Sequence, residues 1–151
     1  GRLHAGNWPA SAPNRAVLEG VLGLLPNKTK EDVCREMEQV LVGRGGFRQG
    51  EDFELKFMYR HDCSVLEPSH PLPRTLLACA AASGSDLAVS GMTASCDAWF
   101  YRNQLDVPTV VFGPGSLKVA HSKDESIELE EIAQAAETLV RLAIEFCGEM
   151  E

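Results

Sequence analysis

The sequence lacks the features that mark several broad classes of protein. None of its five cysteines belongs to a Cys-x-x-Cys pair and their number is odd, which favours reduced thiols in a cytoplasmic protein over a disulfide framework. No apolar run approaches the roughly 20 residues of a membrane span, and no signal peptide is visible. The 14 Lys and Arg residues are outnumbered by 22 Asp and Glu, so the net charge is -8. Because phosphate backbones need clustered cations, we expect no nucleic-acid partner. Without an apolar run long enough to span a membrane, we expect no membrane partner either.

Two catalytic signatures are also missing. Without a Gly-x-Ser-x-Gly elbow, a self-contained α/β hydrolase with a Ser or Cys nucleophile is the weakest alternative. No His-Glu-x-x-His or His-x-x-x-His pair exists, and His4, His61 and His70 all lie in the first half of the chain, far from His121. A zinc site needs three or four protein ligands. Any metal site that uses His121 would therefore need ligands from outside these 151 residues.

The first 60 residues predict a strand, a helix and a strand. Residues 16–25 are mostly apolar and precede Pro26, which predicts a strand. Thr29-x-x-Asp32 predicts a capping box at the start of a helix, and the glycines of 43–46 predict its end. Apolar and polar residues alternate over 53–60, which is typical of a strand with one face in water.

The second half predicts alternating helices and strands. Residues 63–73 carry three prolines and indicate a boundary between two structural units. After this boundary we expect a helix from Pro73 to Gly84 and a strand over 87–89. A turn over 91–97 should then lead into a helix that runs through Tyr101. A strand over 107–112 and a final helix complete the prediction. The final helix places its apolar residues on one face: Leu129, Ile132, Ala136, Leu139, Val140 and Ala143. This alternation predicts a layered α/β sheet. The opening residues, from Gly1 to His4, carry no strand or helix signal and no initiator Met, as in a tag remnant or in a segment of a longer protein.

Candidate site residues follow the predicted strands. Gly113-Pro114-Gly115 comes directly after the 107–112 strand and His121 lies in the next loop, where open α/β sheets commonly bind ligands. The backbone N–H groups of the Gly-Pro-Gly turn could bind a carboxylate or an oxyanion, although a plain turn is the simpler interpretation. His121 is a candidate metal ligand, or else an ordinary exposed loop histidine.

A second candidate loop lies before the predicted helix that runs through Tyr101. The hydroxyls and the carboxyl group of Thr93, Ser95 and Asp97 could contact a ligand. Helix capping is the simpler role for Ser95 or Asp97.

Three motifs together resemble the C-terminal half of the zinc-dependent aminoacylase/carboxypeptidase family, which includes acetylornithine deacetylase, succinyl-diaminopimelate desuccinylase and carboxypeptidase G. The first is residues 6–26, with Gly-Asn-Trp-Pro, Ala-Val-Leu-Glu-Gly and Leu-Pro. The second is Gly-Met-Thr-Ala-Ser-Cys-Asp-Ala over 91–98. The third joins Val-Pro-Thr-Val-Val-Phe-Gly-Pro-Gly over 107–115 to Ala-His-Ser-Lys-Asp-Glu over 120–125. The chain departs from the family pattern at Ala10, where many members have Asn, and near Gly23, where many have Arg.

The resemblance implies a fold and a reaction. Residues 1–62 would belong to an α+β (ferredoxin-like) lid or dimerisation domain, and residues 63–151 to a layered α/β catalytic domain. The reaction would be hydrolysis of an amide: removal of an acyl group from an N-acyl amino acid, or cleavage of a small peptide. Two zinc ions, or cobalt or manganese in their place, would activate the carbonyl and a water molecule.

The resemblance also implies roles for single residues. His121 matches a metal ligand, and Glu125 a residue that holds the histidine loop in place. Gly113 and Gly115 match a loop near the substrate carboxylate, and Thr93, Ser95 and Asp97 a second loop near the substrate. The general base and the other ligands would lie upstream, so no catalytic residue is assigned here and the segment alone would be inactive. The alternative is a non-catalytic module that forms a homodimer through the lid.

Overall fold

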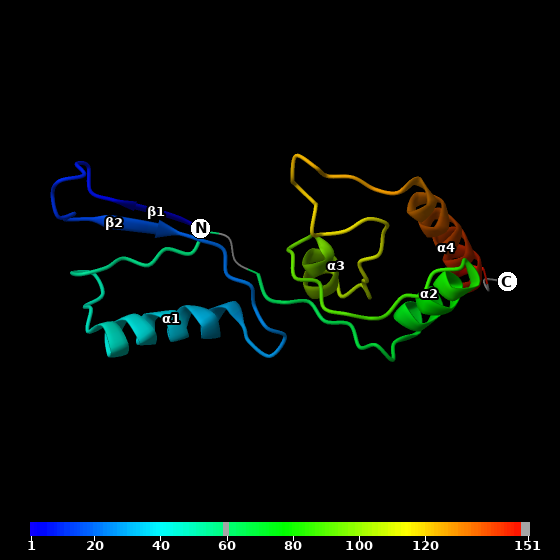
Figure 1. The fold of residues 1–151 in the computed structure, drawn as a ribbon. Helices are drawn as coiled ribbons and strands as arrows, with labels where there is room; N and C mark the ends of the chain where they lie inside the picture. Colours follow the sequence, from blue (N-terminus) through cyan, green and yellow to red (C-terminus); the bar gives the residue numbers. More distant parts are fainter. Residues whose placement is uncertain (59–60, 149–151) are drawn as a thin grey trace.

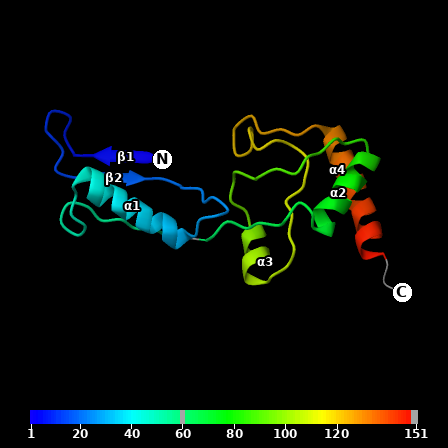
Figure 2. The same cartoon turned by 90° about the horizontal axis from the view of Figure 1, so that it is seen from below.

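The computed structural model describes residues 1–58 and 61–148, which form one hairpin and four helices (Figure 1). In chain order these are β1 (Arg2–Ala5), β2 (Ala16–Glu19), α1 (Lys30–Gly45), α2 (Pro71–Ala82), α3 (Ala98–Gln104) and α4 (Leu129–Cys147). In both views the hairpin and α1 lie at one end of the molecule, α2 and α4 lie at the other, and α3 lies between them (Figure 1, Figure 2). No described helix has the length and hydropathy of a transmembrane helix.

The hairpin corrects the prediction for the first 25 residues. β1 pairs with β2 in antiparallel register from Arg2 opposite Glu19 to Ala5 opposite Ala16, although the sequence predicts no strand for these opening residues. A strand of four residues is too short to carry a clear pattern of its own, and it is stabilised by its partner. The predicted strand over 16–25 is too long, because β2 ends at Glu19 and Val21 is fully exposed.

Helix α1 begins and ends where the sequence predicts. The capping box is present: the Asp32 N–H donates to Thr29 Oγ1 and the Thr29 N–H donates to Asp32 Oδ2, both at 3.1 Å. At the other end Gly46 has φ 64°, a left-handed conformation that glycine adopts without penalty, and its N–H donates to the Leu41 carbonyl.

The second half is built around the packing of α2 against α4. α2 begins at Pro71, two residues before the predicted start, because His70 Nδ1 accepts the Leu72 N–H at 3.1 Å and caps the first turn. The side chains that α2 and α4 bury are small or medium in size: Pro73, Leu76, Cys79, Ala80, Ala135 and Thr138. The predicted apolar face of α4 is exposed along its whole length.

The predicted strands over 53–60, 87–89 and 107–112 are not formed in the part of the chain that the structure describes. Residues 59–60 lie outside the described residues, and residue 53 makes only an isolated bridge with Gln49. A strand requires a neighbour that accepts and donates its backbone hydrogen bonds. These segments have no such neighbour among the described residues, so the layered sheet that the sequence predicts is not assembled here. The division at residue 62 stays a prediction.

Much of the apolar surface is uncovered. The accessible surface is 12438 Å², whereas a compact monomer of this mass would expose about 7,500 Å². Leu18 on the hairpin is 78% exposed, Met58 96% and Leu129 on α4 82%. Most of the large apolar side chains are therefore free to pack against further protein.

Candidate functional site

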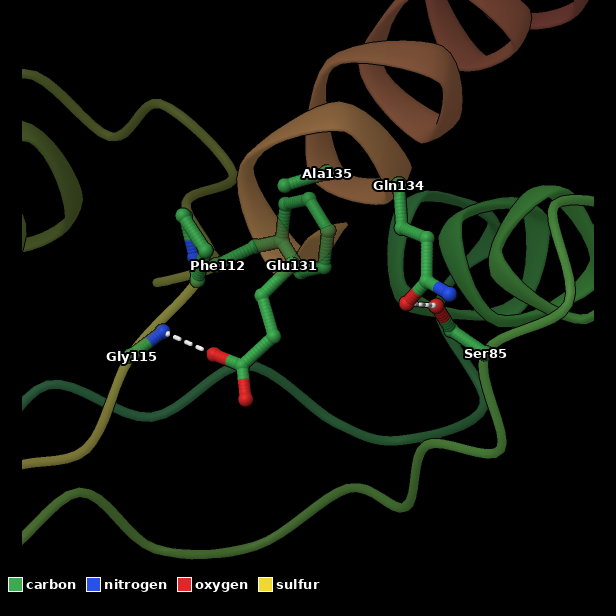
Figure 3. Close-up of a pocket in the computed structure, with 8 residues that line it drawn as sticks. Ser85, Phe112, Gly115, Glu131, Gln134 and Ala135 are labelled. Carbon is green, nitrogen blue, oxygen red and sulfur yellow. Dashed lines mark hydrogen bonds between the residues drawn. The ribbon is translucent and has the colours of Figure 1, made fainter. Parts of the chain in front are cut away.

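The Gly113-Pro114-Gly115 turn lines a cavity of about 100 Å³ against α4 (Figure 3). Phe112 and the turn form one side, Glu131, Gln134 and Ala135 of α4 form the other, and Ser85 follows α2. Ser85 Oγ donates to Gln134 Oε1 at 3.3 Å, on the side of the cavity away from Gly115. The two glycines predicted to contact a substrate thus lie together in a concave site.

A carboxylate of the chain itself already contacts this turn. The Gly115 N–H donates to Glu131 Oε2 at 2.8 Å, a charge-assisted hydrogen bond (Figure 3). Gly115 has φ 90°, a conformation that glycine adopts without penalty and that costs a residue with a Cβ free energy. The turn thus presents the Gly115 N–H to a carboxylate of its own chain, and a role in binding a substrate carboxylate stays a prediction. A substrate carboxylate that takes the same N–H must displace Glu131.

A second cavity, of about 200 Å³, lies beside the first and shares Gly115 and Glu131 with it. Its other walls come from the loop between the turn and α4, through Ser116, Val119, Ser126, Ile127 and Glu128. The Gly115–Glu131 hydrogen bond therefore sits between two hollows on the same face of α4.

His121 adopts a strained conformation in this loop. Its φ is 61°, in the left-handed region that costs most residues with a Cβ free energy and that is found preferentially at functional sites. Its N–H donates to Glu125 Oε2 at 3.1 Å, which is the loop-holding contact expected of Glu125. The imidazole is exposed and lines neither cavity. His121 is thus held by its backbone, with its ring accessible to solvent.

The residues of the 91–97 loop do not join the cavity at the Gly-Pro-Gly turn. Neither cavity is lined by Thr93, Ser95 or Asp97. Asp97 precedes α3 but makes no capping hydrogen bond through its side chain, and Ser95 Oγ lies 3.0 Å from His61 Nε2. Asp97 therefore takes the N-cap position that the simpler interpretation predicts, but without a side-chain hydrogen bond, and the only hydrogen-bond partner shown for the Ser95 side chain among the described residues is His61.

Two residues, Glu131 and His61, make contacts near the candidate site residues, although the sequence predicts no role in a site for either of them. In the sequence Glu131 is only an acidic residue near a helix start, and nothing local links it to Gly115. His61 is there only a histidine distant from His121. Its contacts with residues near 95–99 are non-local, so no spacing rule identifies them.

The described residues do not form a complete metal site. No group of three or more His, Cys, Asp or Glu side chains among residues 1–58 and 61–148 could hold an ion. The role of His121 as one ligand stays a prediction, and the part of the chain that the structure describes does not group further ligands around it.

A nucleophilic cysteine is not supported by α2. Cys79 is 1% exposed, and burial raises the pKa of its thiol above the usual range. Since the thiolate is the reactive form, Cys79 is a packing residue rather than a nucleophile.

Comparison with known proteins gives a family model and two curated relatives. One relative is an N-formyl-4-amino-5-aminomethyl-2-methylpyrimidine deformylase of Halalkalibacterium halodurans, 44% identical over 41 residues, which are 27% of this chain and 10% of the relative. Another is an uncharacterized metallohydrolase of Methanocaldococcus jannaschii, 31% identical over 55 residues, or 36% of this chain and 16% of the relative. The aligned segments thus cover only a small part of each relative. No solved structure matches.

The family model covers nearly the whole chain. The model described as Peptidase family M20/M25/M40 matches residues 9–145, a range that includes every candidate site residue described above. This confirms the resemblance predicted from the sequence motifs, and the family's peptidase fold agrees with the α/β class at the coarse level. The chain belongs to peptidase family M20/M25/M40.

Proposed function

We propose that this chain is a segment of a metal-dependent amide hydrolase, which removes an acyl group from an N-acyl amino acid or cleaves a small peptide. Family membership over residues 9–145 supports a hydrolase, and the names of the two relatives, a deformylase and a metallohydrolase, support acyl removal and a metal. The large uncovered apolar surface supports a segment that packs against further protein. Two zinc ions are our first choice of metal, with cobalt or manganese as alternatives.

His121 carries the proposal. Glu125 holds the backbone of His121 in the left-handed region, and the imidazole ring stays accessible to solvent. This is the arrangement expected of a metal ligand whose site is completed by ligands from outside the chain. The other ligands and the general base are expected from residues outside this chain. On this proposal the 151 residues alone hydrolyse nothing.

The cavity at the Gly-Pro-Gly turn is the proposed seat of the substrate carboxylate. The Gly115 N–H binds a carboxylate in the structure, namely that of Glu131. We assign Gly113 and Gly115 to this role, and Thr93, Ser95 and Asp97 to a second loop at the substrate. This loop does not line the cavity in the chain alone.

The test is metal content measured together with activity in the complete protein. Replacing His121 with Ala should lower metal occupancy and amide hydrolysis in parallel, because a dinuclear site loses one ligand. His4→Ala is the matched control, since His4 is an exposed histidine on β1, away from these loops. Normal metal occupancy in His121→Ala would contradict the ligand role. Stoichiometric metal with turnover in the isolated 151 residues would contradict the segment role.

A second candidate function is a homodimerisation module without catalysis of its own. The hairpin favours it, because each of its two strands pairs only with the other and so has a second edge without a strand neighbour in the described chain. Such edges can pair with a second copy. Analytical ultracentrifugation should then show a dimer, and a strict monomer at high concentration would count against this function.

A further inference from the structure

His61 lies where the two ends of the molecule are joined, and its ring makes contacts on three sides. It stacks on the Trp99 indole of α3 with ring centroids 4.6 Å apart and planes 2° from parallel. Its Nε2 lies 3.0 Å from Ser95 Oγ, and its Nδ1 lies 3.2 Å from the Asp62 carbonyl oxygen. These contacts reach both the 91–97 loop and the first turn of α3.

The chemistry of these partners fixes the direction of the hydrogen bonds. A carbonyl oxygen can only accept, so the bond to the Asp62 carbonyl places the proton on Nδ1. In the neutral ring Nε2 then accepts, and the Ser95 hydroxyl donates to it. Both ring nitrogens are engaged at the same time, so the orientation of the ring is determined and the stack on Trp99 is held.

The next residue contacts the other end of the molecule. Asp62 Oδ1 accepts the N–H of Lys30, the first residue of α1, at 2.7 Å. Asn103 Nδ2 of α3 lies 3.4 Å from the carbonyl oxygens of both Asp62 and Cys63. Two consecutive residues, His61 and Asp62, thus connect the start of α1 to α3 and to the loop before it.

We infer that His61 is a positioning residue that ties the 91–97 loop to the segment joining α1 to the second half of the chain. A movement of α1 acts on Asp62, and through the His61 ring it reaches Ser95 and Trp99. The importance of this connection for substrate binding rests on the role proposed above for the 91–97 loop. The mechanical link itself rests only on the contacts of His61 and Asp62.

Three variants of His61 remove its stacking and hydrogen-bonding contacts in different combinations. His61→Ala removes the stack and both hydrogen bonds. His61→Phe keeps an aromatic ring on Trp99 and removes the hydrogen bonds, whereas His61→Gln keeps a hydrogen-bonding group for Ser95 and removes the stack. His4→Ala is again the matched control, because it removes a histidine on β1.

The experiment is amide hydrogen exchange of the complete protein, followed residue by residue. In His61→Ala, exchange should rise about tenfold over 91–104 while α2 and α4 keep their protection, with smaller increases in the two partial variants. Unchanged exchange over 91–104 overturns the inference, and so does an equal rise over α2 and α4, which would indicate a general loss of stability. If His61→Ala does not fold, the same comparison is made with His61→Phe.

Steady-state kinetics then distinguish this inference from the proposed function. If the loop contacts substrate, His61→Ala should raise KM several-fold with metal content unchanged, the opposite of the pattern expected for His121→Ala. If the protein hydrolyses amides but His61→Ala changes neither KM nor hydrogen exchange in the 91–97 loop, the positioning role is refuted and the proposed function is not. If the protein has no hydrolase activity but His61→Ala still raises hydrogen exchange over 91–104, the proposed function is refuted and the positioning role is not.

Discussion

The two ends of the molecule are stabilised in different ways. At one end β1, β2 and α1 contain no buried residue, and their structure depends on local features: an antiparallel register of four pairs, a capping box and a left-handed glycine. At the other end α2 and α4 bury the only side chains that are nearly inaccessible among the described residues. The first end is specified by short-range signals and the second by packing between segments far apart in the sequence.

Small side chains are what bring α2 and α4 together. Ala80 and Thr138 are fully buried, and Cys79 and Ala135 nearly so. The Thr138 hydroxyl donates to the Gln134 carbonyl of its own helix at 2.8 Å, so its burial leaves no polar group unsatisfied. Substitutions at this contact should therefore have larger effects than those at the other end.

The largest effect is expected from overpacking this contact. Ala80→Leu adds three carbons where no space is left, and should lower the free energy of unfolding by about 1–3 kcal/mol. Ala78→Leu is the matched control, because Ala78 is exposed on the same helix and should change stability little. Urea denaturation followed by circular dichroism measures both. Equal effects of the two variants would show that α2 does not pack closely on α4.

A smaller effect is expected at the Gly-Pro-Gly turn. Ala in place of Gly115 must adopt φ 90°, while the added Cβ would lie 3.5 Å from Ile127, an ordinary contact. The cost is therefore conformational, about 1–2 kcal/mol. Gly113→Ala is the stability control, because a Cβ at Gly113 would meet no atom within 4 Å and the φ of this residue is not positive. If both variants unfold at the same urea concentration, the Gly115 backbone is not constrained by the bond to Glu131.

The difference between short-range signals and packing of distant segments also explains how much of the structure could be predicted from the sequence. The ends of α1 follow from Thr29, Asp32 and Gly46, whose side chains or backbone act on the nearest turn. Signals of this kind act within a turn of the chain, so one sequence is enough to find them. The Glu125 contact with the His121 loop also spans only four residues, although the family resemblance and not a local signal implies it.

What could not be predicted depends on contacts between distant segments. The period of α4 predicts a packing face that includes Leu139 and Val140, but both are exposed, and the helix packs instead through Ala135 and Thr138. Periodicity does not say which neighbour covers a face. The strand predicted over 107–112 is apolar, yet without a neighbouring strand it forms no ladder. The contacts of Glu131 with Gly115 and of His61 with Ser95 span 16 and 34 residues. Nothing in the local sequence specifies these pairs.

The smallest expected effect is on the stability of α1, at the end of the molecule whose structure depends on short-range sequence signals. The side-chain and backbone hydrogen bonds from Thr29 to Asp32 hold the pKa of this carboxyl below its usual value of 3.8. Because the folded pKa lies below the unfolded one, the ionised carboxylate stabilises α1 above pH 3.8, and this contribution is lost as the pH falls through the folded pKa. NMR chemical shifts of α1 during an acid titration should show this loss in the native protein and not in Asp32→Asn. Glu31→Gln removes a charge from the same turn without touching the capping box, so it should retain the transition. A transition that survives in Asp32→Asn would mean that α1 does not depend on its capping box, and the contrast between the two ends would lose its simplest support.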